Sequence, residues 1–579
     1  MRQLSCNQRT TFQILAACHS IVFYIQAAHG AGANCHCTCT EVNKAKLLSK
    51  MVPVIVLVLL ASPLLLLANA IWVTASCYFF TPARIRRILS RQGVHGPAPR
   101  LLVGNLHDVS ALVAESTAGD MGSLSHDIVG RLLPHYVLWS KAFGRLFVYW
   151  YGSEPRVCVT DAGMVRELLS SKHAHVTGKS WLQRQGAKHF IGRGLLMANG
   201  ATWSHQRHVV APAFMADKLR GRVGHMVECT RQTVRALREA VARGGNEVEM
   251  GAHMTRLAGD VIARTEFDTS YETGKRIFHL IEELQRLTAR SSRYVWVPGS
   301  QYFPSKYRRE MKRLNGELEQ VLRESIQRNR EIADEGRTPT SEACGRGLLG
   351  MLLAEMEKKK KKSGFGHGEL GYDAQTIIDE CKTFFFAGHE TSALLLTWAI
   401  MLLATHPEWQ DKARAEVAQV CGDAPPAADH LPKLTVLQMV INETLRLYPP
   451  ATLLPRMAFE DITLSGGLRV PRGASVWIPL LAIHHDEAVW GADAHEFRPD
   501  RFAPGRSRPG AGRFLPFAAG PRNCVGQAYA MVEAKVVLAM LLASFRFGIS
   551  DEYRHAPMNV LTLRPRHGVP VRLLPLPSL

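Results

Sequence analysis

A cysteine near the end of the chain lies between glycines and close to an arginine, in the stretch FAAGPRNCVG at residues 517–526. Gly520 and Gly526 allow tight turns and a close approach of the backbone to a bulky planar group. A helix is predicted to begin just after Cys524, so backbone N–H groups and the helix dipole would favour a thiolate. Arg522 can pair with a carboxylate. These residue types suit a thiolate that binds iron beside an anionic group.

The same stretch resembles the haem-binding loop of the cytochrome P450 monooxygenases, because it contains every fixed position of that loop: Phe517, Gly520, Arg522, Cys524 and Gly526. The resemblance implies that Cys524 is the axial ligand of a haem b iron and that Arg522 holds a haem propionate. In this family the thiolate pushes electron density that favours cleavage of the O–O bond. Dioxygen and electrons from NADPH are therefore expected.

A long apolar helix predicted over residues 373–404 contains the small and polar residues AGHETS at 387–392. Glycine inside a helix costs about 1 kcal/mol relative to alanine, so Gly388 needs a reason. The segment is similar to the oxygen-activation motif of the same family. The resemblance implies that Gly388 makes room for dioxygen, Thr391 hydrogen-bonds the bound oxygen and Glu390 feeds a proton relay. The alternative is a helix–helix contact built on small residues.

Glu443 and Arg446 are three residues apart on one face of a helix predicted over residues 433–447. Alone, such a pair is usually a solvated surface contact. Arg501 follows in the segment FRPDRF at 497–502, which resembles the family's Pro-Glu-Arg-Phe segment with Asp in place of Glu. The resemblance implies a structural triad of Glu443, Arg446 and Arg501 in the core on the haem side.

Further positions match the family's haem-propionate contacts. Trp203 and Arg207 are four residues apart, on one face of a helix, and the family uses this pair at the propionates. Arg456, at the end of PPATLLPR (449–456), matches another propionate-binding position. Together with Arg522, the resemblance implies three cationic groups for two propionates.

Residues 51–80 contain no charged side chain, and about 20 apolar residues suffice to cross a bilayer. Aromatic residues near the end of this segment and arginines directly after it predict a single-pass transmembrane anchor with a cytosolic C-terminal side. The alternative is a buried helix of a soluble core. Residues 1–50 fit this organisation poorly and are interpreted as an upstream extension or a targeting segment.

The composition of the 579 residues, 46% apolar and 21% charged, is typical of a protein with a folded core. A net charge of +20 would suit nucleic acid, an anionic membrane or an acidic protein partner. No aromatic and basic nucleic-acid motif stands out, so no nucleic acid polymer is expected as a partner. Twelve scattered cysteines favour a reducing compartment, and the cluster CHCTC at 35–39 lacks a second ligand pair for zinc.

Apolar residues recur at helical spacing through most of residues 125–350, and short β-branched runs near 147–160 predict strands. More short strands are expected between 461 and 479, and a last helix over 528–545. A run of five lysines at 358–362 predicts a solvated loop. The fold class expected is mainly α with a minor β portion, the cytochrome P450 fold preceded by an N-terminal transmembrane helix.

Four segments are therefore predicted. They are the extension at 1–50, the anchor at 51–80, a basic and proline-containing hinge at 81–105, and a haem-thiolate monooxygenase domain at 106–579. The substrate is expected to be a small molecule bound by the loop at 177–190, the 273–305 region, the helix around 384–391 and residues 451–454.

Within the plant members of the family, INETLRLYPPATLLPRMAFEDI (441–462) and YRHAPMNVLTLRP (553–565) look most like the cytokinin hydroxylases. The resemblance implies hydroxylation of the trans methyl of the isopentenyl side chain of N6-(isopentenyl)adenine-type cytokinins, giving trans-zeatin forms. A separate NADPH–cytochrome P450 reductase would deliver the electrons. The catalytic domain would be cytosolic, anchored in the lipid of the endoplasmic reticulum membrane.

Other functions remain open at this point. The same chemistry would suit a hydroxylase of another plant metabolite, such as a brassinosteroid, a gibberellin or a triterpenoid. From a different class, a haem protein without monooxygenase activity or a rearranging P450 would share the cysteine loop but would not need Glu390 and Thr391.

Overall fold

The computed structural model describes residues 52, 61–62, 64–65, 67–69, 71–269, 271–291, 305–334, 347–362, 372–506, 510 and 512–577. The chain divides into two compact units, Met1–Ser76 and Cys77–Leu579. The predicted segment 1–50 and much of the predicted anchor lie outside the described residues. In the first unit the described residues from 61 onward are helical, and apolar side chains such as Leu64 and Trp72 are exposed. The anchor itself stays a prediction.

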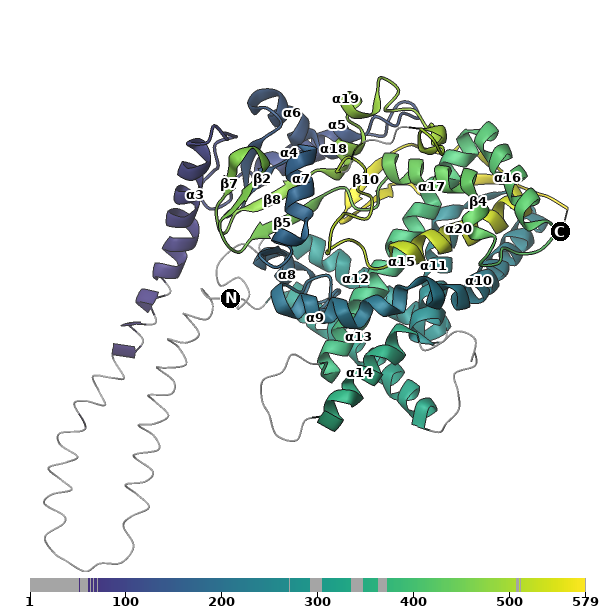
Figure 1. The fold of residues 1–579 in the computed structure, drawn as a ribbon, viewed down its shortest axis with the longest axis horizontal. Helices are drawn as coiled ribbons and strands as arrows, with labels where there is room; N and C mark the ends of the chain where they lie inside the picture. Colours follow the sequence, from purple (N-terminus) through teal and green to yellow (C-terminus); the bar gives the residue numbers. More distant parts are fainter. Residues whose placement is uncertain are drawn as a thin grey trace, which may run out of the picture. The chain divides into compact units, whose positions relative to one another are not determined.

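The second unit is mainly helical and is built around α15 (Ala374–Thr405) (Figure 1). This helix packs against α11 (Met250–Phe267), α12 (Tyr271–Ser291), α17 (Thr435–Leu447) and α20 (Gln527–Ser544). Nearly every side chain of α15 is buried, as expected for a helix that is apolar on all sides.

Two helices among the described residues, α15 and α20, are long and apolar enough to cross a membrane. Most of each apolar window is buried inside the protein, which identifies both as core helices. The remaining long helices cover this core and are α10 (Ala216–Ala242), α13 (Lys306–Asp334), α14 (Leu348–Lys362) and α16 (Pro407–Cys421).

Shorter helices connect the core to the sheets. They are α3 (Thr81–Ser90), α4 (Leu106–Ser116), α5 (Val129–Leu132), α6 (Pro134–Phe143), α7 (Ala162–Leu169), α8 (Trp181–Ala187), α9 (Gly200–Val210), α18 (Leu480–His484) and α19 (Glu487–Trp490).

The largest sheet has the strand order β1-β2-β8-β5-β3 and lies on the side of α3 in Figure 1. The strands are β1 (Phe147–Tyr151), β2 (Glu154–Cys158), β8 (Ser475–Ile478), β5 (Leu454–Ala458) and β3 (Thr177–Gly178). β2 and β8 are parallel, and the other pairs are antiparallel. Pairing of β3 with β5 therefore brings two segments together that are more than 270 residues apart.

Three smaller sheets complete the fold. β4 (Glu247–Glu249), β12 (Pro570–Pro575) and β9 (Phe545–Ile549) form one of them, and β6 (Ile462–Leu464) pairs with β7 (Leu468–Val470). The third is a hairpin of β10 (Pro557–Val560) and β11 (Thr562–Pro565), in which Val560 faces Thr562 around Leu561. The mainly α fold with a minor β portion is thus as predicted.

Three local predictions were wrong. The lysines at 358–362 end helix α14 and are not a loop, because lysine is a good helix former whatever its charge. The segment at 177–190 is not a plain loop, since it contains β3 and α8. The first ten residues of the predicted hinge form α3, with Pro82 in the first turn, where a proline fits a helix.

Candidate active site

The loop that contains Cys524 is closed by its own backbone. The amide of Cys524 donates to the Phe517 carbonyl at 2.9 Å, and the amide of Asn523 donates to the Gly520 carbonyl at 3.0 Å. The next residues lead into α20, whose first residue is Gln527. The helix therefore begins three residues after the cysteine, close to where the sequence predicted it.

The two glycines of this loop differ in whether the surrounding polypeptide leaves room for a side chain. Gly520 has φ +69°, and a Cβ atom there would lie 1.8 Å from the carbonyl oxygen of Leu169. The polypeptide itself therefore demands glycine at 520. A Cβ at Gly526 would lie 4.0 Å from both the Cys524 Sγ and a ring carbon of Phe214, an ordinary contact. Packing within the chain thus leaves room at 526, as a bulky planar group beside the cysteine would require.

The Cys524 side chain is exposed, although the surrounding protein desolvates its thiol. Desolvation raises the pKa of Cys524, while the Gly526 N–H group and the Arg207 charge lower it. The sequence predicted only the lowering, and the net direction is upward. The polypeptide alone favours the thiol, and coordination to a metal is what deprotonates such a group outright.

No group of three or more His, Cys, Asp or Glu side chains suited to a metal occurs among the described residues. A metal at Cys524 would therefore take most of its ligands from a cofactor. A single thiolate would fit a haem iron, because the macrocycle itself would supply the ligands that the polypeptide lacks.

A cluster of buried cations lies near the cysteine loop. The guanidinium carbon of Arg522 lies 4.2 Å from the ring centroid of Trp203, and Arg522 donates to the carbonyls of Ala174 and Ala198. One nitrogen of Arg522, Nη2, is buried without a partner. Burial and the charge of Arg456 lower the pKa of Arg522 to about 10. Burial lowers the pKa of Arg456 to about 10 as well.

Lys179 is a third member of this cation cluster, and the sequence did not predict it. Burial, with the charges of Arg456 and Arg522, lowers the pKa of Lys179 to about 7. Lys179 directly follows β3, and the antiparallel pairing of β3 with β5 brings it beside Arg456. Buried cations that repel one another call for an anion, and two propionates meet that need.

Arg207 lies elsewhere in the site. Its two Nη atoms donate to the main-chain carbonyl and the Oδ1 of Asn523, both at 2.7 Å. Trp203, on the same helix α9, contacts Arg522 instead. The structure thus brings Trp203, Arg456 and Arg522 together and places Arg207 against the cysteine loop.

The Gly388 backbone faces α11. A Cβ atom at this position would lie 2.7 Å from Cδ1 of Ile262, so glycine allows α15 and α11 to approach closely. The helix–helix alternative therefore accounts for this glycine. Thr391, one turn further on, donates its hydroxyl to the Ala387 carbonyl at 2.7 Å. The proposed contact of Gly388 with dioxygen stays a prediction.

The Glu390 side chain is buried and accepts hydrogen bonds from three residues on two other elements. Gln285 on α12 donates to Oε2 at 2.7 Å, while Thr562 and Arg564 on β11 donate to Oε1. None of these three partners was predicted, because no motif connects them with the segment AGHETS.

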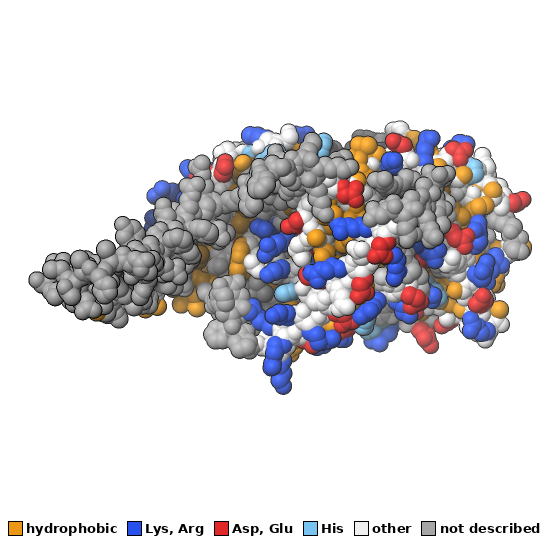
Figure 2. Space-filling model, turned by 90° about the horizontal axis from the view of Figure 1, so that it is seen from below, with side chains coloured by type: hydrophobic (Ala, Val, Ile, Leu, Met, Phe, Trp, Pro, Cys, Tyr) orange, Lys and Arg blue, Asp and Glu red, His pale blue; other side chains and the backbone are white. Residues whose placement is uncertain are grey.

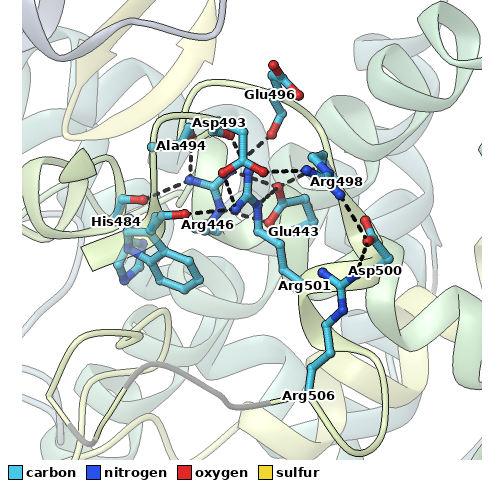
Figure 3. Close-up of polar contacts among 11 residues, drawn as sticks. Glu443, Arg446, His484, Asp493, Ala494, Glu496, Arg498, Asp500, Arg501 and Arg506 are labelled. Atoms are coloured by element: carbon cyan, nitrogen blue, oxygen red, sulfur yellow. Dashed lines mark hydrogen bonds and ion pairs between the residues drawn. The ribbon is translucent and has the colours of Figure 1, made fainter. Parts of the chain in front are cut away.

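The Glu443–Arg446 pair is fully buried, and two of the Arg446 nitrogens donate to the two carboxylate oxygens at 2.7 Å (Figure 3). The Arg501 Nε lies 3.4 Å from Glu443 Oε1. Arg501 also binds Asp493, whose other oxygen pairs with Arg498. The structure therefore brings the three predicted residues into one network and enlarges it.

Arg446 also ties the network to the backbone, since it donates to the carbonyls of His484 and Ala494. Asp500, which replaces the glutamate of the family segment, pairs with Arg498 and Arg506 and does not contact Glu443. The substitution leaves the core of the network unchanged.

Comparison with known proteins matches residues 127–569 to the family model described as Cytochrome P450. The chain belongs to the cytochrome P450 family. Two proteins named cytokinin hydroxylase from Arabidopsis thaliana are 54% and 52% identical to it. The first alignment covers 87% of this chain and 96% of the relative, and the second covers 91% and 99%. Cytochrome P450 734A6 of Oryza sativa subsp. japonica is 37% identical over 86% of this chain and 92% of its own.

This cytochrome P450 is accordingly a monooxygenase with a haem-thiolate cofactor. Its closed cysteine loop, the room beside Gly526 and the cluster of Arg456, Arg522 and Lys179 all fit that group.

Proposed function

We propose that this cytochrome P450 hydroxylates the trans methyl of the isopentenyl side chain of N6-(isopentenyl)adenine-type cytokinins. The supporting observation is identity above 50% to two cytokinin hydroxylases over nearly their full lengths, against 37% for a P450 of another name. One oxygen atom of dioxygen enters the C–H bond and the other leaves as water. Two electrons come from NADPH through a separate reductase, and two protons come from solvent.

The proximal residues have distinct tasks in this proposal. Cys524 binds the haem iron, and the bound haem supplies the activation of dioxygen. Arg456, Arg522 and Lys179 bind the propionates, which neutralises the buried positive charge. Trp203 holds the Arg522 guanidinium by a cation–π contact. Arg207 holds the cysteine loop through Asn523.

On α15, Thr391 is proposed to take part in the proton relay by accepting a hydrogen bond from the group that carries the proton. Its hydroxyl hydrogen is already donated to the Ala387 carbonyl, so the oxygen lone pairs are available as acceptors. Glu390 was expected to feed this relay. Its hydrogen bonds to Gln285, Thr562 and Arg564 give it a second task, which is developed below.

The substrate side chain is apolar, and the start of β5 offers apolar side chains that could contact it. Leu453 and Leu454 are partly buried there. A steroid or triterpenoid would also contact these leucines favourably, so the adenine moiety must distinguish the substrates.

We also propose that residues 51–80 anchor the enzyme in the endoplasmic reticulum membrane with the catalytic domain in the cytosol. Lysine and arginine side chains are spread over the face shown in Figure 2, with acidic side chains between them. A basic surface favours encounter with an acidic face of the reductase, and salt should slow that encounter.

The test is a reconstitution of the full-length protein with haem, lipid, NADPH–cytochrome P450 reductase and NADPH. Isopentenyladenine, its riboside and its ribotide are offered in parallel with a brassinosteroid, a gibberellin and a triterpenoid. A trans-zeatin-type product supports the proposal. Turnover of one of the other compounds without any zeatin-type product overturns it.

A further inference from the structure

Glu390 is the meeting point of three elements that are far apart in the sequence. We call Glu390, Gln285, Thr562 and Arg564 the Glu390 cluster. Gln285 comes from α12, Thr562 and Arg564 come from β11, and Glu390 lies in the segment of α15 between Gly388 and Thr391. Both carboxylate oxygens are occupied by donors.

The Glu390 side chain is not joined to the predicted relay by any hydrogen bond of the described residues. Thr391 donates to Ala387 within its own helix, whereas every hydrogen bond of the Glu390 carboxylate runs to another element. A carboxylate that accepts from an arginine and two neutral donors is tied firmly to the elements that carry those donors. Such a group holds its neighbours in place.

The β10–β11 hairpin is fastened at several points besides the cluster. The Leu563 carbonyl accepts from the indole N–H of Trp398 on α15, and the Leu563 amide donates to the Pro450 carbonyl, both at 3.0 Å. Asn559 on β10 donates to Thr452, in the segment before β5, at 2.7 Å. These bonds leave the hairpin little freedom to move relative to α15.

Leu561 is the tip of this hairpin and adopts a backbone conformation that is unfavourable for leucine. Its φ is +66°, and its side chain is 56% exposed. A left-handed conformation is unfavourable for a residue with a Cβ and persists only where the surroundings fix it. The neighbouring residue Thr562 is the one whose hydroxyl binds Glu390. The cluster therefore fixes the strained tip next to the oxygen-activation segment.

We propose that Glu390 is a positioning residue that, through Gln285, Thr562 and Arg564, holds α12 and the β10–β11 hairpin in register with the Gly388–Thr391 segment. By this means it determines which carbon of the substrate side chain is hydroxylated. The part of this proposal that concerns the hydroxylated carbon rests on the function proposed above. The part that concerns the position of the hairpin does not depend on that function.

The test compares Arg564→Gln, Gln285→Leu and Glu390→Gln with the unchanged protein, all as full-length, haem-loaded enzyme. Arg572→Gln is the matched control, because it makes the same change in an exposed ion pair on β12. The first measurement is hydrogen–deuterium exchange of residues 557–565 and 271–291. The second is the ratio of trans- to cis-hydroxylated product from isopentenyladenosine.

We expect exchange in the hairpin to become about tenfold faster in each cluster variant, as the loss of a charged hydrogen bond produces. The product ratio should shift severalfold toward the cis isomer. The double variant Glu390→Gln/Arg564→Gln should resemble the single variants, because each change removes the same contact. Arg572→Gln should change neither measurement.

Unchanged exchange in Arg564→Gln and Gln285→Leu overturns the proposal, and so does an unchanged product ratio in a protein with faster exchange. If the unchanged protein makes no zeatin-type product, the proposed substrate is wrong, and the exchange measurement alone decides the positioning role. If Arg564→Gln does not fold, Gln285→Leu and Thr562→Val test the same contact from the other two partners.

Discussion

The Arg522 guanidinium lies on the Trp203 ring, 4.2 Å from its centroid, with one buried nitrogen that has no hydrogen-bond partner. Arg456 and Lys179 lie in the same cluster, and burial, with the charges of Arg456 and Arg522, lowers the pKa of Lys179 to about 7. An anion bound among the three cations would neutralise this buried positive charge. The cation cluster explains the arginine two residues before the cysteine, which the cysteine loop by itself does not explain.

Removing one of these cations should weaken haem retention. We expect Arg456→Leu or Lys179→Met to lower the haem content of the purified protein severalfold, because each removes a propionate partner from a buried site. The ratio of haem absorbance to protein absorbance measures this. Arg506→Gln, a change in an exposed ion pair with Asp500, is the control and should retain haem. Full haem content in both cation variants would contradict the assignment.

A buried carboxyl on α20 should make stability depend on pH. Burial raises the pKa of Glu533 from 4.5 to about 8, and Ser392 donates to its Oε2 at 2.6 Å. The folded state therefore holds a proton that the unfolded state releases, and stability falls as pH rises from 4.5 to about 8. Glu533→Gln keeps a neutral amide there and should flatten that part of the profile.

The measurement for Glu533 is the unfolding midpoint between pH 5 and 8.5 in the unchanged protein and the glutamine variant. The advantage of the variant should grow with pH and become constant above about pH 8. An advantage that is equal at all pH values would show that Glu533 does not titrate in this range.

The role of Thr391 can be tested against a residue with the same local geometry. Thr397, on the same helix, also donates its hydroxyl to the carbonyl four residues before it at 2.7 Å. We expect Thr391→Ala to lower the fraction of NADPH consumption that yields product by about a hundredfold, at the lower end of the usual range for a lost proton-transfer group. Thr397→Ala should leave that fraction unchanged. Equal coupling in the two variants would rule out the relay.

Gly388 has two competing explanations that one pair of variants can separate. Gly388→Ala should lower the unfolding midpoint, because its methyl would lie 2.7 Å from the Ile262 side chain. Ile262→Ala in the same chain makes room and should restore most of the stability. If activity returns with it, helix packing explains the glycine. If activity stays low in a stable protein, the room that Gly388 leaves is needed for dioxygen.

Much of the fold and part of the site could be predicted from the sequence. The helices α15 and α20 are long apolar segments, and their bounds fall within one or two residues of the prediction. The cysteine loop was recognised because its residues are close together in the chain. Glu443 and Arg446 share a helical turn, so their pairing needed no knowledge of the tertiary structure.

What the sequence could not predict depends on contacts between distant segments. Lys179 joins the cation cluster only because β3 pairs with β5, and a two-residue strand leaves almost no pattern. Arg564 lies 174 positions from Glu390, and no spacing rule connects them. The pKa of Cys524 was predicted from its neighbours in the chain, whereas the burial that dominates it comes from the whole fold.

The hairpin and α15 are joined at two places, through Glu390 and through Trp398, about 12 Å apart along the helix axis. Because both attachments lie on the same helix, they move together. We therefore expect the residues of the hairpin that make these contacts to tolerate few substitutions. Leu561, at the tip, lies outside both strands and makes neither of these two contacts. Position 561 is therefore the part of the hairpin where a change of side chain disturbs the attachments to α15 least.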